Sequence, residues 1–331
     1  MKVLVTGGAG YIGSHSCQAL AAAGHQPVVY DNLRTGHLWA VQHGPFEHGD
    51  ILDGDRIFNV LRSHKIDAVM HFAALAYVGE SLGQPDLYYR TNVTGTLSLL
   101  AAMRTAGTEK FVFSSTCATF GAIDHPIAED DPQTPINPYG ASKLMVERIL
   151  QDYARAFGLG SISLRYFNAA GSDPEGRLGE VHWPETHLIP LALQTAAGLR
   201  PGIEVFGTDY LTPDGTCIRD YIHVCDLADA HVRALGAIEP AKAKAYNLGN
   251  GAGFSVRQVI DRVEAVTGRT VPWTAAPRRP GDPPRLIACA DAAKADLGWA
   301  PNRPTLDDMI SHAWSFLTDP NSASRNRQAS Q

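Results

Sequence analysis

Short apolar runs alternate with helical patterns through the first half of the chain. The runs are rich in β-branched residues and rarely alternate with polar positions, which is typical of strands covered on both faces of a parallel sheet. Segments with helical periodicity separate the runs, and this order predicts βαβ units. The predicted strands are 2–6, 27–30, 46–50, 68–72 and 110–114, and the predicted helices are 14–23, 56–64, 88–106 and 142–157.

The pattern changes after about residue 165, where proline and glycine become frequent. We expect a smaller, loop-rich lobe there, with helices at 188–197, 256–266 and 306–316. Segments 161–165 and 220–224 are predicted to return as strands to the first sheet, so the two lobes interleave. The expected fold is α/β, a Rossmann-like doubly wound parallel sheet with a smaller α+β lobe. Its expected divisions are 1–170, 171–320 with 216–238 returning to the sheet, and a frayed polar tail at 321–331.

Composition narrows the class of protein. The 331 residues are 44% hydrophobic and 19% charged, as in an ordinary globular protein of about two domains. The net charge is −6 and forms no basic face, which argues against nucleic acid or a membrane surface as a partner. The 5 cysteines form no CxxC pair, and we expect reduced thiols and no metal site. The initial apolar run is too short for a signal peptide, so a cytoplasmic protein is expected.

A glycine pattern follows the first predicted strand. Gly7, Gly10 and Gly13 lie where that strand turns into a helix, a position that lets backbone N–H groups approach a pyrophosphate. The second strand ends at Asp31, where a carboxylate accepts hydrogen bonds from a ribose diol and repels a 2′-phosphate. Residues 50–51 close the third strand and offer an adenine a carboxylate and an apolar wall. The spacing favours NAD, although a glycine-rich turn and a solvated acid remain the alternative interpretation.

A tyrosine and a lysine stand four residues apart in a predicted helix. Pro138 suits the first helical turn, so Tyr139 and Lys143 share one face. An ammonium beside a phenol stabilises the phenolate and lowers the pKa, which allows the pair to remove a hydroxyl proton. Thr116 ends the preceding strand, at the edge of the sheet that faces ligands. By itself the tyrosine–lysine spacing also fits an exposed tyrosine and a solvated lysine.

Several motifs together resemble the UDP-glucose 4-epimerase family of extended short-chain dehydrogenases/reductases. The similarity runs from residue 1 to about residue 314, and it includes GGAGYIG (7–13), NPYGASK (137–143), RYFNAAG (165–171) and GTCIRDYIHVCDLADAH (215–231). The resemblance implies reversible C4 epimerisation of a UDP-sugar, UDP-glucose to UDP-galactose, through a transient 4-keto intermediate. It also implies bound NAD and a homodimer that pairs helices 88–106 and 142–157.

The resemblance implies three sets of site residues. The catalytic set would be Thr116, Tyr139 and Lys143. The NAD-binding set would be Gly7, Gly10, Tyr11, Ile12, Gly13, Asp31, Asn32, Asp50, Ile51, Phe72, Ala73, Ala74, Lys143 and Phe167. The set that binds UDP-sugar would be Thr116, Tyr139, Asn168, Leu188, Phe206, Arg219, Tyr221, Arg279 and Asp282.

Three departures and two alternatives accompany the resemblance. Ala76 stands where many members carry lysine, His187 stands where some carry asparagine, and segment 282–291 is about two residues longer.

The motifs HFAALAYVGES (71–81), SSTCATFG (114–121), SDPEGRLGE (172–180) and GTDYLTPDGTC (207–217) are also similar to UDP-xylose/UDP-arabinose 4-epimerases, which differ only in the pocket for the C5 substituent. A non-catalytic, NAD-binding regulatory protein is the more distant alternative. Such relatives lose the tyrosine or the lysine, and this chain keeps both.

Overall fold

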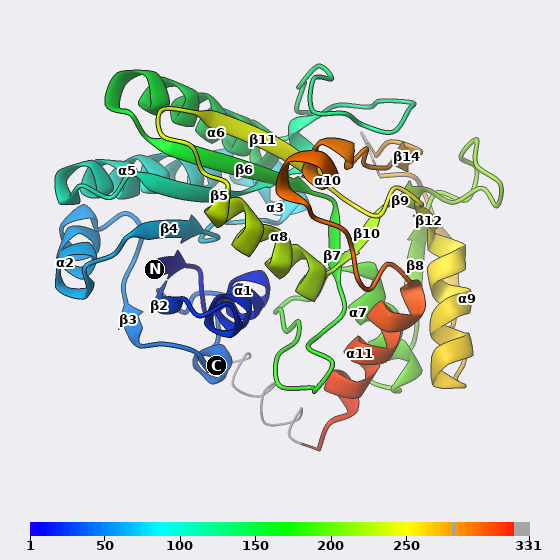
Figure 1. Cartoon of the computed structure of the whole chain (residues 1–331). Coiled ribbons are helices and arrows are strands. Elements are labelled where there is room, and N and C mark those ends of the chain that lie inside the picture. Colours follow the sequence, from blue (N-terminus) through cyan, green and yellow to red (C-terminus); the bar gives the residue numbers. More distant parts are fainter. Residues whose placement is uncertain (280–281, 321–331) are drawn as a thin grey trace.

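Seven parallel strands form the main sheet of the computed structural model, which describes residues 1–279 and 282–320 (Figure 1). Their order, β11–β6–β5–β4–β1–β2–β3, reverses direction between β1 and β4, which confirms the doubly wound sheet. The predicted tail, 321–331, lies outside the described residues. The strands are β1 (Lys2–Thr6), β2 (Gln26–Asp31), β3 (Phe46–His48), β4 (Ala68–His71), β5 (Lys110–Thr116), β6 (Gly160–Tyr166) and β11 (Ala243–Leu248).

Helices cover both faces of this sheet (Figure 1). Alternate side chains of each strand point to opposite faces, so Val3 and Val5 join one core and Leu4 joins the other. The apolar runs of the sequence are continuous because both faces of each strand are buried under helices. The first face is covered by α1 (Tyr11–Ala22), α8 (Val224–Gly236) and α10 (Asp291–Leu297), and the second by α2 (Gly54–His64), α5 (Gly95–Ala106) and α6 (Pro138–Phe157).

The helical stretch predicted at 88–106 is divided. It contains the end of α4 (Pro85–Tyr88), a π-helical turn η2 (Tyr89–Thr94) and α5, and α3 (Val78–Gly83) precedes it. The π-helical turn carries Asn92, whose buried amide pairs with both backbone groups of Leu75 and donates to the Ser142 hydroxyl. Such turns occur where one side chain must be aimed at a particular place. Asn92 thereby fastens the loop after β4 to α6.

The smaller lobe is α+β, as predicted. Its three helices and short sheets enclose a separate apolar core. The helices are α7 (Leu188–Ala196), α9 (Val256–Thr267) and α11 (Leu306–Thr318). The strands are β7 (Asn168–Ala170), β8 (Ile203–Phe206), β9 (Ile218–Arg219), β10 (Tyr221–His223), β12 (Phe254–Ser255), β13 (Trp273–Ala276) and β14 (Arg285–Leu286), and two 3₁₀ turns, η1 (Leu38–Ala40) and η3 (Cys117–Thr119), complete the elements.

One strand prediction is wrong. Segment 220–224 does not return to the main sheet, because β10 pairs in parallel with β7 outside it. The segments that do return are α8, β11 and α10, and β11 is a strand that the pattern did not predict. Its sequence, AKAYNL, lacks the β-branched run of the other strands. The lobe boundary near residue 170 stays a prediction.

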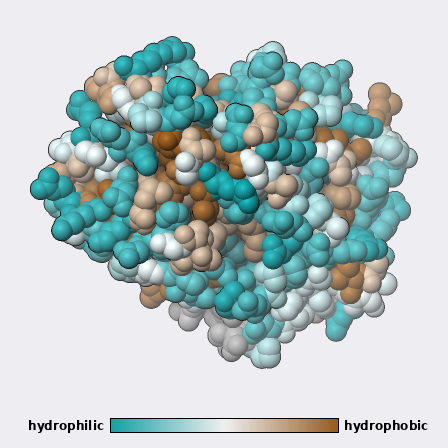
Figure 2. Space-filling view, viewed as in Figure 1, coloured by the Kyte–Doolittle hydropathy of each residue, from teal (hydrophilic) through white to brown (hydrophobic). Residues whose placement is uncertain are grey.

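We find no candidate membrane-spanning helix in the described ranges. None of the helices within them is long and apolar enough to cross a bilayer. The visible face is mostly hydrophilic, with apolar residues in smaller patches (Figure 2).

The turn after β1 depends on two glycines. Gly7 has φ +72°, and a Cβ there would lie 2.6 Å from the Ala73 nitrogen. A Cβ on Gly13 would lie 2.1 Å from the Gly7 carbonyl oxygen. Both distances are shorter than any van der Waals contact, so the turn, the loop after β4 and α1 approach one another only through glycine.

We expect Gly13→Ala to lower the free energy of unfolding by about 1–3 kcal/mol, the usual cost of overpacking. Urea denaturation measures this loss. The matched control is Gly236→Ala at the end of α8, where a Cβ would meet nothing within 4 Å. That change should leave the stability unchanged or raise it by up to about 1 kcal/mol, and equal losses in the two variants would contradict the steric argument.

Candidate active site

The N-terminus of α1 is built to receive an anion. Its N-cap is Gly10, and among the described residues no side chain caps the helix and no acidic group lies in its first turn. The first backbone N–H groups of a helix have no intrahelical partner and carry the positive end of the helix dipole. Tyr11, Ile12 and Gly13 supply these groups. The turn can therefore hold a phosphate or pyrophosphate.

Asp31 lies beside this turn, at the end of β2. Its carboxylate accepts hydrogen bonds from the backbone N–H groups of Ala9, at 3.0 Å, and Leu33, at 2.8 Å. The residue is 7% exposed, and burial raises the pKa of the carboxyl group while the two N–H donors oppose that rise. The structure thus holds this carboxylate in one fixed position next to the glycine turn.

The residues predicted to contact adenine meet at the ends of β2 and β3. Asn32 donates to the Asp50 carboxylate at 2.8 Å, and the other oxygen of that carboxylate accepts from the Leu52 N–H at 2.9 Å. Ile51 packs so closely on Gly95 that a Cβ there would lie 2.6 Å from the Ile51 Cδ1. A carboxylate and an apolar wall therefore stand side by side.

The loop after β4 adds the next part of the site. The N–H groups of Phe72 and Ala73 both donate to the Thr6 carbonyl oxygen, which ties the loop to the end of β1. Ala74 follows in this loop, and Ala76, where many members of the family carry lysine, is exposed. Phe167, just after β6, is buried in a small apolar cluster with Phe120. Phe72 and Ala73 follow β4, and Phe167 follows β6, so these residues lie at the carboxyl edge of the sheet.

The start of α6 positions the predicted catalytic pair. Asn137 caps this helix by accepting from the Gly140 N–H at 2.8 Å, and the next residue is proline at the first helical position. Thr116, at the end of β5, lies close enough to Tyr139 to lower the pKa of its phenol, against the larger rise that burial causes. Lys143 Nζ donates to the Ser114 carbonyl oxygen at 2.8 Å. The predicted catalytic residues are thus gathered at one place.

Burial controls the protonation of both groups. It raises the pKa of the Tyr139 phenol to about 12 and lowers the pKa of the Lys143 ammonium to about 7. The expectation that the ammonium lowers the pKa of the phenol is not met, because the lysine is engaged with the Ser114 carbonyl and both groups are desolvated. The negative charge of Glu147 opposes the fall in the pKa of Lys143.

A buried ion pair supports this site, and sequence reasoning missed it. Glu147 follows Lys143 by one helical turn, and its carboxylate binds the Arg165 guanidinium at 2.6 Å and the Ser115 hydroxyl at 2.5 Å. Both charged side chains are about 95% buried, with 5% and 6% exposed. Arg165 also donates to the Glu129 carbonyl oxygen at 3.0 Å. The spacing of Lys143 and Glu147 was visible in the sequence, but their partners on β5 and β6 were not.

The predicted substrate residues form two groups. Asn168 and Tyr221 are register partners on β7 and β10. Arg219 on β9 forms an ion pair with Asp282. The guanidinium group of Arg279 lies 4.0 Å from the centre of the Phe206 ring. Leu188 begins α7 and packs partly against the core of the smaller lobe.

Comparisons with known proteins agree with this geometry. The model of the NAD dependent epimerase/dehydratase family matches residues 3–249. The UDP-glucose 4-epimerase of Rhizobium meliloti (strain 1021) is 53% identical over 317 residues, which are 95% of this chain and 96% of that protein. The chain belongs to the UDP-glucose 4-epimerase family.

Solved structures of family members superpose closely on the chain. The UDP-glucose 4-epimerase from Brucella ovis in complex with NAD has a TM-score of 0.92 and 52% identity, covering 95% of this chain and 98% of that one. The enzyme from Stenotrophomonas maltophila, with bound NAD and formylated UDP-arabinopyranose, has a TM-score of 0.93 and 42% identity, covering 98% of this chain and 99% of that one.

Cys117 lies in the site, but its surroundings do not favour the thiolate that a nucleophile requires. Cys117 follows Thr116, and burial raises the pKa of its thiol to about 12 although Arg219 opposes the rise. A thiol with this pKa stays protonated at neutral pH. Cys117 packs against the small apolar cluster that contains Phe120 and Phe167.

We expect Glu147→Gln to lower the free energy of unfolding by about 3–5 kcal/mol, because Arg165 stays buried without its counter-charge. Urea denaturation measures the loss. The control is Asp307→Asn, which removes the half-exposed partner of Arg262 and should cost less than about 1 kcal/mol. Similar losses in the two variants would show that burial does not strengthen the internal pair.

The low pKa of Lys143 predicts a pH dependence of stability. An unfolded lysine titrates near about 10.4, so between about 7 and that value the unfolded chain binds one proton more than the folded chain. This lysine therefore makes the free energy of unfolding rise with pH, by up to about 1.4 kcal/mol per unit. We expect the stability of wild type relative to Lys143→Met to grow over that range. A difference independent of pH would mean that the Lys143 pKa is unshifted.

Proposed function

We propose that the chain interconverts UDP-glucose and UDP-galactose at C4, with NAD held at the carboxyl edge of the main sheet. One observation carries this proposal: Tyr139 and Lys143 on α6 meet the end of β5 at Thr116 and Ser114, and β5 ends at the same carboxyl edge of the sheet as β1 with its glycine turn. The relatives support it, since proteins about half identical over nearly the whole chain are UDP-glucose 4-epimerases. A non-catalytic role is disfavoured because the complete catalytic set is present.

The nucleotide site fits NAD. The turn leaves no room for a side chain at Gly7 or Gly13, the start of α1 offers free N–H groups, and Asp31 is fixed beside them for a ribose diol. A carboxylate at this place favours NAD over its 2′-phosphorylated form. When bound, NAD supplies a reversible hydride acceptor for the sugar C4 carbon.

Tyr139 moves the proton in this mechanism. Its phenolate takes the proton of the sugar 4-hydroxyl, directly or through Thr116, and C4 becomes a ketone. Lys143 stands one helical turn away on α6, and its protonated form would favour the phenolate against the burial that disfavours it. The planar 4-keto sugar turns about its diphosphate link and presents its other face. Tyr139 then returns the proton to the 4-oxygen while C4 would take the hydride back on its other face, which leaves the opposite configuration and no net redox change.

The smaller lobe holds the UDP part of the substrate. The guanidinium group of Arg279 lies over the Phe206 ring, and that of Arg219 is ion-paired with Asp282. These two guanidinium groups bind the diphosphate of the substrate in this proposal. A chain with a net charge of −6 offers no general attraction for this anion, so these local groups must supply it. Strong binding at the diphosphate leaves the sugar ring free to turn.

Tyr139→Phe tests the proposal directly. We expect interconversion of UDP-galactose and UDP-glucose to fall by about 10²–10⁴-fold, the usual contribution of a positioned acid–base group, while NAD released on denaturation stays at the wild-type amount. The control is Tyr153→Phe on the same helix, which should keep full activity. Retained activity in Tyr139→Phe would overturn the mechanism. Parallel assays with UDP-arabinose test the pentose alternative, for which the Stenotrophomonas maltophila complex is the supporting observation.

We also propose a homodimer formed by α5 and α6. Leu97 on α5 and Met145 on α6 are 38% and 45% exposed, and these two helices lie on the same face of the main sheet. Two other apolar residues of α5 do not reach this surface. Leu100 and Met103 are buried against the sheet, because helical periodicity does not say which apolar positions face inward.

We expect the double variant Leu97→Glu/Met145→Glu to be monomeric in size-exclusion chromatography with light scattering, whereas wild type is dimeric. The control is Leu211→Glu, at an apolar side chain that is 96% exposed in the smaller lobe. This variant should remain a dimer. A monomeric wild type, or a dimer in the double variant, would reject the proposed surface.

A further inference from the structure

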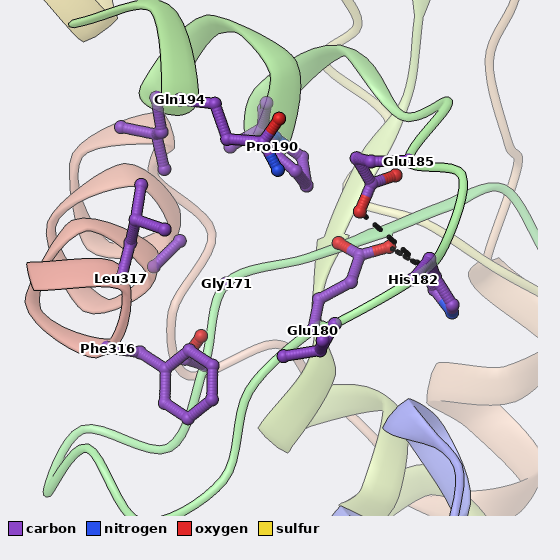
Figure 3. A pocket seen from close by; sticks show the side chains of 13 residues that line it. Gly171, Glu180, His182, Glu185, Pro190, Gln194, Phe316 and Leu317 are labelled. Carbon is purple, nitrogen blue, oxygen red and sulfur yellow. Dashed lines mark ion pairs between the residues drawn. The ribbon is translucent and has the colours of Figure 1, made fainter. Parts of the chain in front are cut away.

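Two carboxylates and two imidazoles converge in the segment that leads into α7. Glu180, His182, Glu185 and His187 follow the pattern ExHxxExH, and their ligand atoms all lie within 4.8 Å of one another. Figure 3 shows Glu180, His182 and Glu185 pointing toward one another at one side of a pocket, with Phe316, Leu317 and Gln194 along the opposite side. None of the four has a role in the proposed epimerisation.

The distances in this cluster match those between ligands of one metal ion. His187 Nδ1 lies 2.9 Å from an oxygen of Glu180 and 2.9 Å from an oxygen of Glu185. His182 Nδ1 lies 3.1 Å and 3.6 Å from oxygens of the same two carboxylates. For metal–ligand bonds of about 2.1 Å, adjacent ligand atoms stand about 3.0–3.4 Å apart in octahedral or tetrahedral geometry. These four nitrogen–oxygen distances, which involve one oxygen of Glu180 and both oxygens of Glu185, are close to this spacing, and the four ligand atoms all lie within 4.8 Å of one another.

Burial gives the cluster a second feature of a ligand site. The side chains of Glu180 and Glu185 are only 8% and 5% exposed, so their charges need compensation. His182 Nδ1 is buried and lacks a hydrogen bond of ordinary geometry within the described parts of the chain. His187 is 46% exposed, which leaves one side of the cluster open to solvent. The His182 Nδ1 atom therefore faces two buried carboxylates at ion-pair distance, without a hydrogen bond of ordinary geometry in the described residues, and it lies next to an entry path.

We propose that Glu180, His182, Glu185 and His187 bind a divalent transition-metal ion, with Zn²⁺ as the best fit. A set of two nitrogen and two oxygen ligands suits Zn²⁺, whereas Mg²⁺ and Ca²⁺ prefer oxygen alone. Imidazole nitrogens bind the metal in their neutral form, so the ion displaces the protons that otherwise bridge the imidazoles and carboxylates.

The surroundings give this ion a structural role. The rings of Tyr11 and Tyr77 pack edge-on against His182, with centres 6.4 Å and 6.2 Å away. The Tyr11 hydroxyl donates to the Gly171 carbonyl oxygen at 2.6 Å, just after β7. Since α7 begins directly after His187, a bound ion fixes the segment that joins the nucleotide turn of the main sheet to the smaller lobe.

The test uses the full chain without a histidine tag, treated with EDTA, loaded with Zn²⁺ and desalted. We expect about one zinc ion per chain by elemental analysis. Glu180→Gln and His182→Ala should each lower the retained zinc at least about 10-fold, as loss of a ligand does. The matched control is His125→Ala, which removes an exposed histidine that contacts only Asp124 and Asp131. The control should keep the wild-type amount of zinc.

X-ray absorption of the zinc-loaded wild type decides the question even where the variants fail to fold. Two imidazole and two oxygen ligands near about 2.0–2.1 Å support the site. Sulfur ligands near about 2.3 Å would place the zinc on the free cysteines and overturn the proposal. A wild type that retains no zinc, or a Glu180→Gln variant that folds and retains the full amount, would overturn it too. The four groups would then be ion pairs, consistent with the carboxylates raising the pKa of His182 to about 9.

Discussion

The buried ion pair between Glu147 and Arg165 is the constraint on which the site depends most. It connects α6 to the adjacent strands β5 and β6, and α6 also carries Tyr139 and Lys143. A charged pair in the interior is tolerated only when its geometry and its extra hydrogen bonds are good. Here the carboxylate receives the guanidinium and the Ser115 hydroxyl, so the register of α6 against the sheet has one favourable arrangement. That arrangement brings the phenol of Tyr139 to Thr116.

The same desolvation that makes the ion pair specific also tunes the catalytic groups. Lys143 lies between the Ser114 carbonyl and the Phe113 ring, 4.8 Å from the ring centre, and it cannot keep an ordinary ammonium pKa there. Glu147 opposes this shift through its negative charge. Tyr139 shows the opposite change, because burial disfavours the phenolate. Burial thus favours the uncharged form of both groups, and the pKa of the phenol lies well above that of the amine.

Charge distribution explains how an acidic chain handles anionic ligands. With a net charge of −6, the protein attracts no diphosphate at long range. Binding depends instead on the N-terminus of α1 and on single arginines whose charge is balanced in place, as Arg219 is by Asp282. The same principle applies to the proposed metal site, where two buried carboxylates form a local negative centre. Local donors, and not the overall field, determine what this protein binds.

The sequence by itself determined the doubly wound sheet, the glycine turn and the partnership of Tyr139, Lys143 and Thr116. These features are local: apolar runs define buried strands, glycine spacing defines a close turn, and four-residue spacing defines one helix face. Only the tertiary structure decided that Glu147 meets Arg165, that β10 pairs with β7, and that Leu100 faces inward. The tertiary structure also decided that the side chains of Glu180 and His187 meet, although the spacing of the two residues could be seen in the sequence. Contacts between distant segments and the direction of a side chain depend on how elements pack, and desolvation by that packing sets each pKa.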